Sequence, residues 1–313
     1  MERSGKMKYV VIGAGGTGGP IGGFLTRAGK DVTLIARGEH LKKIREYGLQ
    51  FETPSGSFTV PVKACAMEEY QGSADVIFVC VKGYSLADTI PFIERIGDSH
   101  TVVIPVLNIY GTGKELQKSL PDIPVMDGCM YIASEIQESG KILISGNIFR
   151  VIYGLRKDAG EELKKRILPV LKEIEKDLKD AGSAPEVSDE IEKDALQKFS
   201  FISPMAALGS CYDVCAAEFQ KPGPLREKFV AMVEEIKALS DAMGIHLPDD
   251  IAEINLKILD GFAPQATASM QRDIKNGRQS ELDGLVCQVV RMGEQYHVPV
   301  PVYKETAEKL LRP

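Results

Sequence analysis

The chain has 313 residues, 44% of them hydrophobic and 26% charged, which is the composition of an ordinary soluble globular protein long enough for two domains. Its net charge of −6 indicates no basic surface for nucleic acid, and no apolar run reaches the roughly 18 to 20 residues that a membrane helix needs. The N-terminus also lacks the apolar core of a signal peptide. We therefore expect a cytoplasmic protein with neither a nucleic-acid nor a membrane partner.

The first half of the chain alternates between strand and helix patterns. Apolar stretches predict strands in MKYVVIGA, DVTLIA, ADVIFVCVK and HTVVIPVLN, and helices are predicted over residues 16–29, 38–47 and 84–97. The segment GLQFETPSGSFTVPV predicts a hairpin, and VMDGCMYIA, GKILISG and FRVIYG predict further short strands. The first predicted strand begins at Met7. We therefore interpret Met7 as the ancestral start of the chain and MERSGK as an extension before it. Repeated β–α units predict a parallel sheet with right-handed crossovers.

After residue 155 the pattern becomes helical. EELKKRILPVLKEIEKDLKDAG predicts an amphipathic helix, and GSAPEVSD (182–189) reads as a linker. Helices are then predicted over residues 189–217, 222–243, 249–260, 268–276 and 280–296. We therefore predict an α/β Rossmann-type dinucleotide-binding domain over residues 1–186, followed by an all-α helical domain over residues 187–313. Domain seams are frequent locations of ligand sites, so we expect the active site between the two.

The segment IGAGGTGGPIGG, residues 12–23, has the G-x-G-x-x-G spacing between a predicted strand and a predicted helix. Gly13 permits the tight turn, Gly15 lets the backbone approach a pyrophosphate, and Gly18 allows close packing of helix on strand. The N–H groups at the start of the helix suit a phosphate. The predicted cofactor-binding residues of this loop are Gly13, Ala14, Gly15, Gly16, Thr17 and Gly18. The alternative is a glycine-rich turn without a ligand.

Three polar residues follow later strands. Arg37 stands where an NAD enzyme would carry an acidic residue for the ribose, and a guanidinium suits a 2′-phosphate, so we predict NADPH rather than NADH. The same arginine argues against an S-adenosylmethionine methyltransferase. Lys82 could reach a cofactor phosphate, and the Asn108 amide could contact the nicotinamide ribose or the substrate. Each of the three could instead be an ordinary loop or turn residue.

Cysteine and histidine give no metal pattern. Cys211 and Cys215 would share a helix face, but no histidine lies near them in sequence to complete a site. We therefore predict no metal, and free thiols in a reducing cytoplasm.

Lys198 directly precedes an apolar run in KDALQKFSFISPMAALGS, residues 193–210. Lysine is rarely buried without a partner, so its aliphatic stem could simply lie along the apolar surface with the ammonium in water. The alternative is a functional amine at the mouth of an apolar patch.

Together these segments resemble the ketopantoate reductases (2-dehydropantoate 2-reductases) over nearly the whole chain. The resemblance rests on GAGGTG, on AR after the second strand, on VKGY after the fourth, and on SMQRDIKNGRQSELDGL, residues 269–285. It implies NADPH-dependent reduction of a 2-oxo acid, most simply 2-dehydropantoate to pantoate in pantothenate and coenzyme A biosynthesis. It also implies that Lys198 is the general acid, that Glu281 arranges the lysine or the cofactor, and that Ser269 binds substrate.

The chemistry agrees with an amine at this position. Hydride transfer to a ketone leaves charge on the oxygen, which an ammonium can protonate or stabilise while also attracting the substrate carboxylate. Burial would lower the pKa of such a lysine, and a nearby Glu281 would raise it again. Without a functional role, Glu281 would be an acid that suits a helix N-terminus and Ser269 a helix cap.

Two departures from the family pattern concern the substrate. The chain has NIYG where the family usually has Asn-Gly, and Ile202 and Ala206 stand where asparagines often follow the lysine. A related but more apolar 2-oxo acid is therefore an alternative substrate, and a non-catalytic NADP(H)-binding sensor is a second alternative. The partner we expect is a small 2-oxo acid, and a homodimer is left open.

Overall fold

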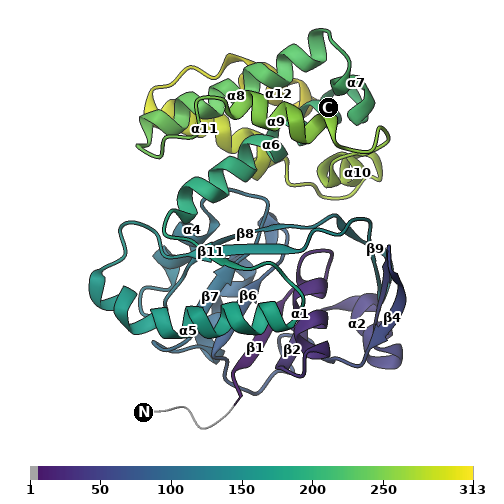
Figure 1. The fold of residues 1–313 in the computed structure, drawn as a ribbon, viewed down its shortest axis with the longest axis vertical. Coiled ribbons are helices and arrows are strands. Elements are labelled where there is room, and N and C mark those ends of the chain that lie inside the picture. The colour runs from purple at the N-terminus through teal and green to yellow at the C-terminus, as the bar shows by residue number, and fades with distance from the viewer. Residues whose placement is uncertain (1–5, 313) are drawn as a thin grey trace. The chain divides into compact units, whose positions relative to one another are not determined.

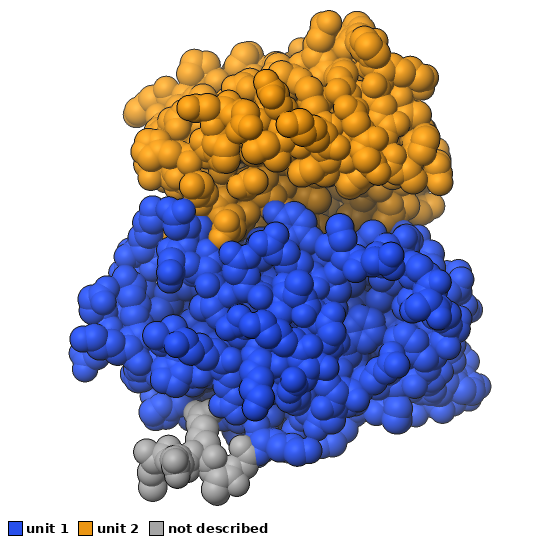
Figure 2. Space-filling view, viewed as in Figure 1, with its two compact units in different colours: residues 1–107, 111–191 blue, residues 108–110, 192–313 orange. Residues whose placement is uncertain are grey.

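The computed structural model describes residues 6–312, so MERSGK lies outside the described residues except for Lys6. The chain forms two compact units, coloured separately in Figure 2. The first contains the residues up to Leu107 together with Gly111–Ile191, and the second contains Asn108–Tyr110 together with the residues from Glu192 onward.

This grouping differs from the predicted boundary at residues 186/187 in two places. β12 (Glu186–Val187) pairs in parallel with β11 (Arg150–Gly154), which ties the end of the predicted linker to the first unit. Asn108–Tyr110 belong to the helical unit although they closely follow a strand of the first.

The first unit is built on a parallel sheet with strand order β5-β2-β1-β6-β7 (Figure 1). Its strands are β1 (Lys8–Ile12), β2 (Asp31–Ile35), β5 (Lys63–Cys65), β6 (Val76–Val79) and β7 (Val102–Pro105). The helices of this unit are α1 (Gly18–Arg27), α2 (Gly38–Tyr47), α3 (Ile90–Ile96), α4 (Thr112–Ser119) and α5 (Glu161–Asp180). The alternating strand and helix pattern thus folds as predicted, with the glycine loop directly after the central strand.

Both faces of the sheet are buried, as the continuous apolar strands require. Successive side chains of a strand point to opposite faces. Val11 of β1 therefore shares a core with Leu25 of α1 and Ile174 of α5, while Val10 shares another with Phe92 of α3.

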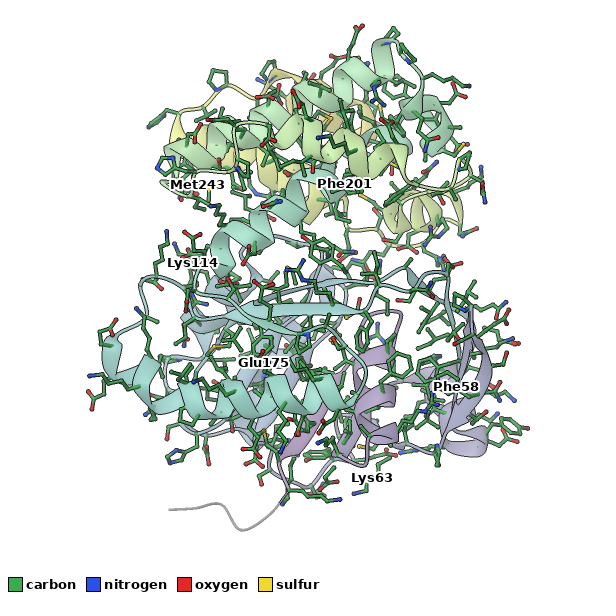
Figure 3. The ribbon with its side chains drawn as sticks, in the orientation of Figure 1. Phe58, Lys63, Lys114, Glu175, Phe201 and Met243 are labelled. Carbon is green, nitrogen blue, oxygen red and sulfur yellow. The ribbon has the colours of Figure 1, made fainter. Side chains whose placement is uncertain are left out.

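Two smaller sheets complete this unit. The hairpin predicted around Pro54-Ser55-Gly56 is formed by β3 (Leu49–Thr53) and β4 (Gly56–Val60). It continues through β10 (Lys141–Ile144) to β9 (Ser134–Glu138), and β8 (Asp127–Tyr131) pairs with β11 in the third sheet. Phe58 of the hairpin, labelled in Figure 3, stacks on Phe51 with ring centroids 5.2 Å apart.

The second unit is helical. Its helices are α6 (Ile191–Tyr212), α7 (Ala216–Gln220), α8 (Pro224–Ala242), α9 (Ile251–Asp260), α10 (Ser269–Lys275), α11 (Gln288–Tyr296) and α12 (Pro301–Leu311). The predicted helix 189–217 ends at Tyr212 because Asp213 has a left-handed backbone, with φ of 47°. Phe201 of α6, labelled in Figure 3, packs edge-on against Phe229 of α8 within the core of this unit.

In the part of the chain that the structure describes, no helix combines the length and apolar character that crossing a membrane would require.

Candidate functional site

Three segments that carry predicted cofactor-binding residues begin at the same edge of the parallel sheet, where the strands end. In its register, Ile12 at the end of β1 lies beside Ile35 of β2 and Val79 of β6. The segments after these strands carry the glycine loop, Arg37 and Lys82 in turn. Ligands of open α/β sheets bind beyond the carboxyl ends of the strands, which is this edge.

A cavity of about 480 Å³ opens there. The predicted cofactor-binding residues that line it are Gly13, Ala14, Gly15, Arg37 and Lys82. Two cationic side chains therefore share one cavity with the partly buried backbone of the glycine loop, and the acidic residues Glu68 and Asp88 also line it. The two cations and the loop backbone suit an anionic nucleotide.

The glycines of the loop differ in what excludes a side chain. Gly13 has φ of 96°, and a Cβ on Gly18 would lie 2.0 Å from the Gly13 carbonyl oxygen, so the protein's own atoms require glycine at both positions. A Cβ on Gly16 would likewise meet the Ser134 carbonyl oxygen at 2.7 Å. A Cβ on Gly15 would approach only Ile136 among the described atoms, at 3.8 Å. The space beside Gly15 is thus open to a ligand, which fits a dinucleotide.

The start of α1 is also suited to an anion. Thr17 occupies the N-cap position without a side-chain capping hydrogen bond in the described structure, and the first turn of α1 holds no acidic residue. Backbone N–H groups at a helix N-terminus lack intrahelical partners and attract negative charge. The start of α1 therefore suits an anionic group such as a phosphate.

His40, which sequence reasoning missed, lines the same cavity. The N–H of Gly140 donates to Nδ1 of His40 at 3.0 Å, so the neutral ring carries its proton on Nε2. That Nε2–H donates to the carbonyl oxygen of Ala14 at 2.8 Å. His40 thereby holds the glycine loop, but its partners are 26 and 100 residues away in sequence, so no local pattern indicates the role.

Cys80 also lines the cavity. Burial raises the pKa of the Cys80 thiol. A thiol kept protonated is a poor nucleophile, so this residue offers packing to the cavity and no thiolate chemistry.

In the helical unit, Lys198 of α6 meets Asn108. The Lys198 ammonium Nζ donates a hydrogen bond of 2.7 Å to the amide oxygen Oδ1 of Asn108, which lies 90 residues earlier in the chain. Both side chains are partly buried. The structure thus brings together two residues that were predicted separately to bind substrate.

Glu281 and Ser269 belong to the same unit. Glu281 is only 6% exposed, and its carbonyl oxygen accepts the N–H of Leu285 at 2.9 Å. Ser269 is the first residue of α10, whose N-cap position is taken by Ala268, so Ser269 is not the helix cap.

Ile202 and Ala206, which stand where the family often has asparagines, also lie on α6. Ala206 is buried in the helical core, and Ile202 is partly buried against it. Their side chains present no polar group to a substrate.

Among residues 6–312, no group of three or more histidine, cysteine, aspartate or glutamate side chains is arranged to hold a metal ion. All six cysteines are free.

Comparison with known proteins identifies two matching family models. The model described as ketopantoate reductase PanE/ApbA matches residues 9–157, and the model described as ketopantoate reductase PanE/ApbA C terminal matches residues 190–311. The two matches correspond to the α/β part and the helical part of the chain.

Individual relatives are about a quarter identical to the chain over most of its length. The 2-dehydropantoate 2-reductase of Lactococcus lactis is 27% identical over 303 residues, covering 94% of each chain. The uncharacterized oxidoreductase YkpB of Bacillus subtilis is 26% identical over 303 residues, covering 95% of each. Among solved structures, D-mandelate dehydrogenase with NADH and anilino(oxo)acetate shares the fold, with a TM-score of 0.87 at 22% identity over 97% of both chains.

Proposed function

The chain belongs to the ketopantoate reductase family, and from this premise we propose that it reduces a 2-oxo acid to a 2-hydroxy acid with NADPH. The first candidate substrate is 2-dehydropantoate, the reaction of its named relative in Lactococcus lactis. The product would then be pantoate, for pantothenate and coenzyme A biosynthesis.

The first unit would bind the cofactor, which when bound supplies the hydride. Gly13, Ala14 and Gly15 offer backbone to the pyrophosphate, with Gly16, Thr17 and Gly18 forming the turn into α1 behind them. Arg37 would bind the 2′-phosphate of the cofactor, and Lys82 would bind an oxygen of another cofactor phosphate. The support for this is their common cavity, and the choice of NADPH depends on Arg37.

The hydrogen bond between Lys198 and Asn108 is the observation that carries the proposal. A snorkelling lysine would need no partner at its ammonium, whereas a proton donor must be held at one point. Lys198 would bind the substrate carboxylate or ketone oxygen and donate the proton as charge develops on that oxygen. Asn108 would hold the ammonium and contact the substrate or the nicotinamide ribose.

Glu281 and Ser269 have supporting roles in this proposal. Glu281 would arrange Lys198 or the cofactor, since a buried carboxylate is retained only where it has partners to stabilise its charge. Ser269 would donate its hydroxyl to the substrate, a role that agrees with its position outside the cap of α10.

A more apolar 2-oxo acid is the second candidate substrate. It is favoured by Ile202 and Ala206, which offer only hydrocarbon on the helix that carries Lys198. A protein of the same fold is a D-mandelate dehydrogenase solved with NADH and anilino(oxo)acetate, a carboxylate that carries an aromatic ring. A non-catalytic NADP(H) sensor would need the cavity of the first unit but not the Lys198–Asn108 pair.

The test is NADPH oxidation, followed at 340 nm, against a panel of 2-oxo acids that contains 2-dehydropantoate, 2-oxoisovalerate, phenylpyruvate and benzoylformate. We expect saturable turnover of 2-dehydropantoate. A kcat/KM that is highest for benzoylformate or phenylpyruvate would establish the second candidate. If fluorescence shows NADPH binding but no acid is turned over, the result would support the alternative of a non-catalytic NADP(H)-binding sensor.

A further inference from the structure

The segment Asn108–Tyr110 is held by the helical unit through three consecutive contacts. Asn108 accepts the hydrogen bond from Lys198 at 2.7 Å. Ile109 packs against Gly284, and the carbonyl oxygen of Tyr110 accepts a hydrogen bond from Nε2 of Gln288 at 2.8 Å. Asn108 is therefore positioned by its two neighbours as well as by its own side chain.

With Ile109 in its present rotamer, the contact with Gly284 leaves no room for a side chain at position 284. A Cβ on Gly284 would lie 2.4 Å from Cδ1 of Ile109 and 2.8 Å from its Cγ1. Ile109 is one of the two departures from the family pattern, where glycine usually follows the asparagine. In this chain the isoleucine is accommodated by a glycine on the opposite side of the contact.

Gly284 lies in a π-helical turn, Asp283–Cys287, which leads into α11. Such turns are rare and weaken the regular helical ladder. Here the hydroxyl of Ser203 on α6 donates to the carbonyl oxygen of Leu285 at 2.6 Å. Because a hydroxyl has one proton, the 2.6 Å contact between Ser203 and Tyr303 uses the Tyr303 hydroxyl as donor.

The π-helical turn is therefore fixed on one side to α6, the helix of Lys198, and on the other to the segment of Asn108. We propose that Gly284 and Gln288 are positioning residues that hold Asn108 with its amide oxygen toward the Lys198 ammonium. The inference rests on the proposed function in one respect, namely that Lys198 is the proton donor.

The chemistry of an amide makes this positioning necessary. Only Oδ1 can accept from an ammonium, and a displaced or rotated amide would present its NH₂ donors to the positive charge. A shift of about 1 Å in the backbone of Asn108 can reduce turnover by roughly a hundredfold without affecting distant binding contacts.

The test begins with Gly284→Ala. We expect kcat to fall by about tenfold to a hundredfold while the Kd for NADPH stays within twofold, because the added methyl displaces Ile109 and with it Asn108. The double variant Ile109→Ala/Gly284→Ala should recover most of the activity, since the clashing atoms are gone. Gln288→Met, which keeps the length but loses the donor, should lower kcat by about two- to tenfold.

Two controls separate positioning from a general loss of structure. Gly261→Ala, in the same unit, meets its nearest atom at 3.4 Å and should leave kcat unchanged. In the Lys198→Met background, Gly284→Ala should cause no further loss of kcat, because its effect passes through the lysine. A loss of the same size in both backgrounds, or no recovery in the double variant, would overturn the inference.

A substrate-independent measurement keeps the inference distinct from the proposed function. In protein labelled with ¹³Cε-lysine, the Lys198 resonance can be assigned with Lys198→Met and titrated with pH. We expect its shift and apparent pKa to change in Gly284→Ala and to return in the double variant. That result supports the positioning role even if no 2-oxo acid is reduced, and an unchanged Lys198 resonance would refute the role even in an active enzyme.

Discussion

The ammonium of Lys198 is bonded to the amide oxygen of Asn108 at 2.7 Å, across 90 residues of sequence. An amide oxygen orients an ammonium without neutralising its charge, whereas a carboxylate would also offset the charge. The hydrogen bond with Asn108 therefore orients the ammonium without itself offsetting the positive charge.

Lys198→Met tests whether this ammonium is the proton donor. The substitution keeps the apolar stem and removes the amine, so we expect kcat to fall by about 10²- to 10⁴-fold, the usual effect of losing a positioned proton donor. NADPH affinity should be retained, since the glycine loop, Arg37 and Lys82 are untouched. Steady-state kinetics and a fluorescence titration measure the two effects. Lys221→Met, at an exposed lysine of the same unit, is the control, and turnover of Lys198→Met within a few-fold of wild type would mean that the lysine only snorkels.

Arg37→Ala tests the preference for NADPH. Losing charge-assisted hydrogen bonds of about 1.5–3 kcal/mol should weaken NADPH binding by roughly ten- to over a hundredfold. The Kd for NADH should change by less than threefold. Isothermal titration with both cofactors measures this difference. Lys42→Ala removes a positive charge from α2 at a side chain that is 69% exposed, and should affect neither cofactor. If Arg37→Ala weakens the binding of NADPH and NADH equally, Arg37 does not bind the 2′-phosphate.

Two alanine substitutions in the glycine loop should affect different properties, one NADPH binding and the other stability. Gly15→Ala has room for its methyl in the protein, so we expect an unchanged melting temperature and loss of NADPH binding as the methyl meets the pyrophosphate. Gly18→Ala forces a methyl to within 2.0 Å of the Gly13 carbonyl oxygen and should lower stability by about 1–3 kcal/mol or more. Thermal unfolding with and without NADPH distinguishes them. Gly146→Ala, whose added Cβ would meet only the Cβ of Ala133 at 3.9 Å, should match wild type. Normal NADPH binding by Gly15→Ala would refute the assigned role.

Glu235 should make the stability of the helical unit depend on pH. Its carboxylate accepts the N–H groups of Val302 and Tyr303 at the start of α12, at 2.7 and 3.1 Å. Burial raises the pKa of Glu235, and these two bonds oppose the shift in part. An acid whose folded pKa is raised contributes most below its unfolded pKa of about 4.3, and that contribution is lost as pH rises through the folded value.

Comparison with Glu235→Gln isolates this contribution. We expect the free energy of unfolding of wild type, relative to Glu235→Gln, to decrease as pH rises from about 4 to 7. Urea unfolding at several pH values measures the difference. Glu234→Gln, at the exposed neighbouring position, should show no such trend. A wild-type advantage that grows with pH would contradict the assigned direction of the pKa shift.

Local patterns in the sequence were sufficient for the main elements of the fold. The apolar strands, the turn at Pro54-Ser55-Gly56 and the G-x-G-x-x-G loop all depend on hydrogen bonding and sterics within a few residues. The parallel sheet followed from their alternation with helices. α4 and α12 were not predicted. α4 buries only one large apolar side chain, Leu116. α12 begins at Pro301, and the prediction did not use proline as a signal for the first turn of a helix.

Tertiary structure alone decided how the site residues are held. The predicted residues Lys198 and Asn108 are separated by 90 residues, and nothing near either one indicates the other. His40 joins Ala14 to Gly140, and Gly284 provides the space for Ile109, through contacts that no spacing rule contains. The physical reason is that sequence periodicity reports hydrogen bonds and packing within one element. A side chain's distant partners are determined only when the elements pack and the buried polar groups must find donors and acceptors.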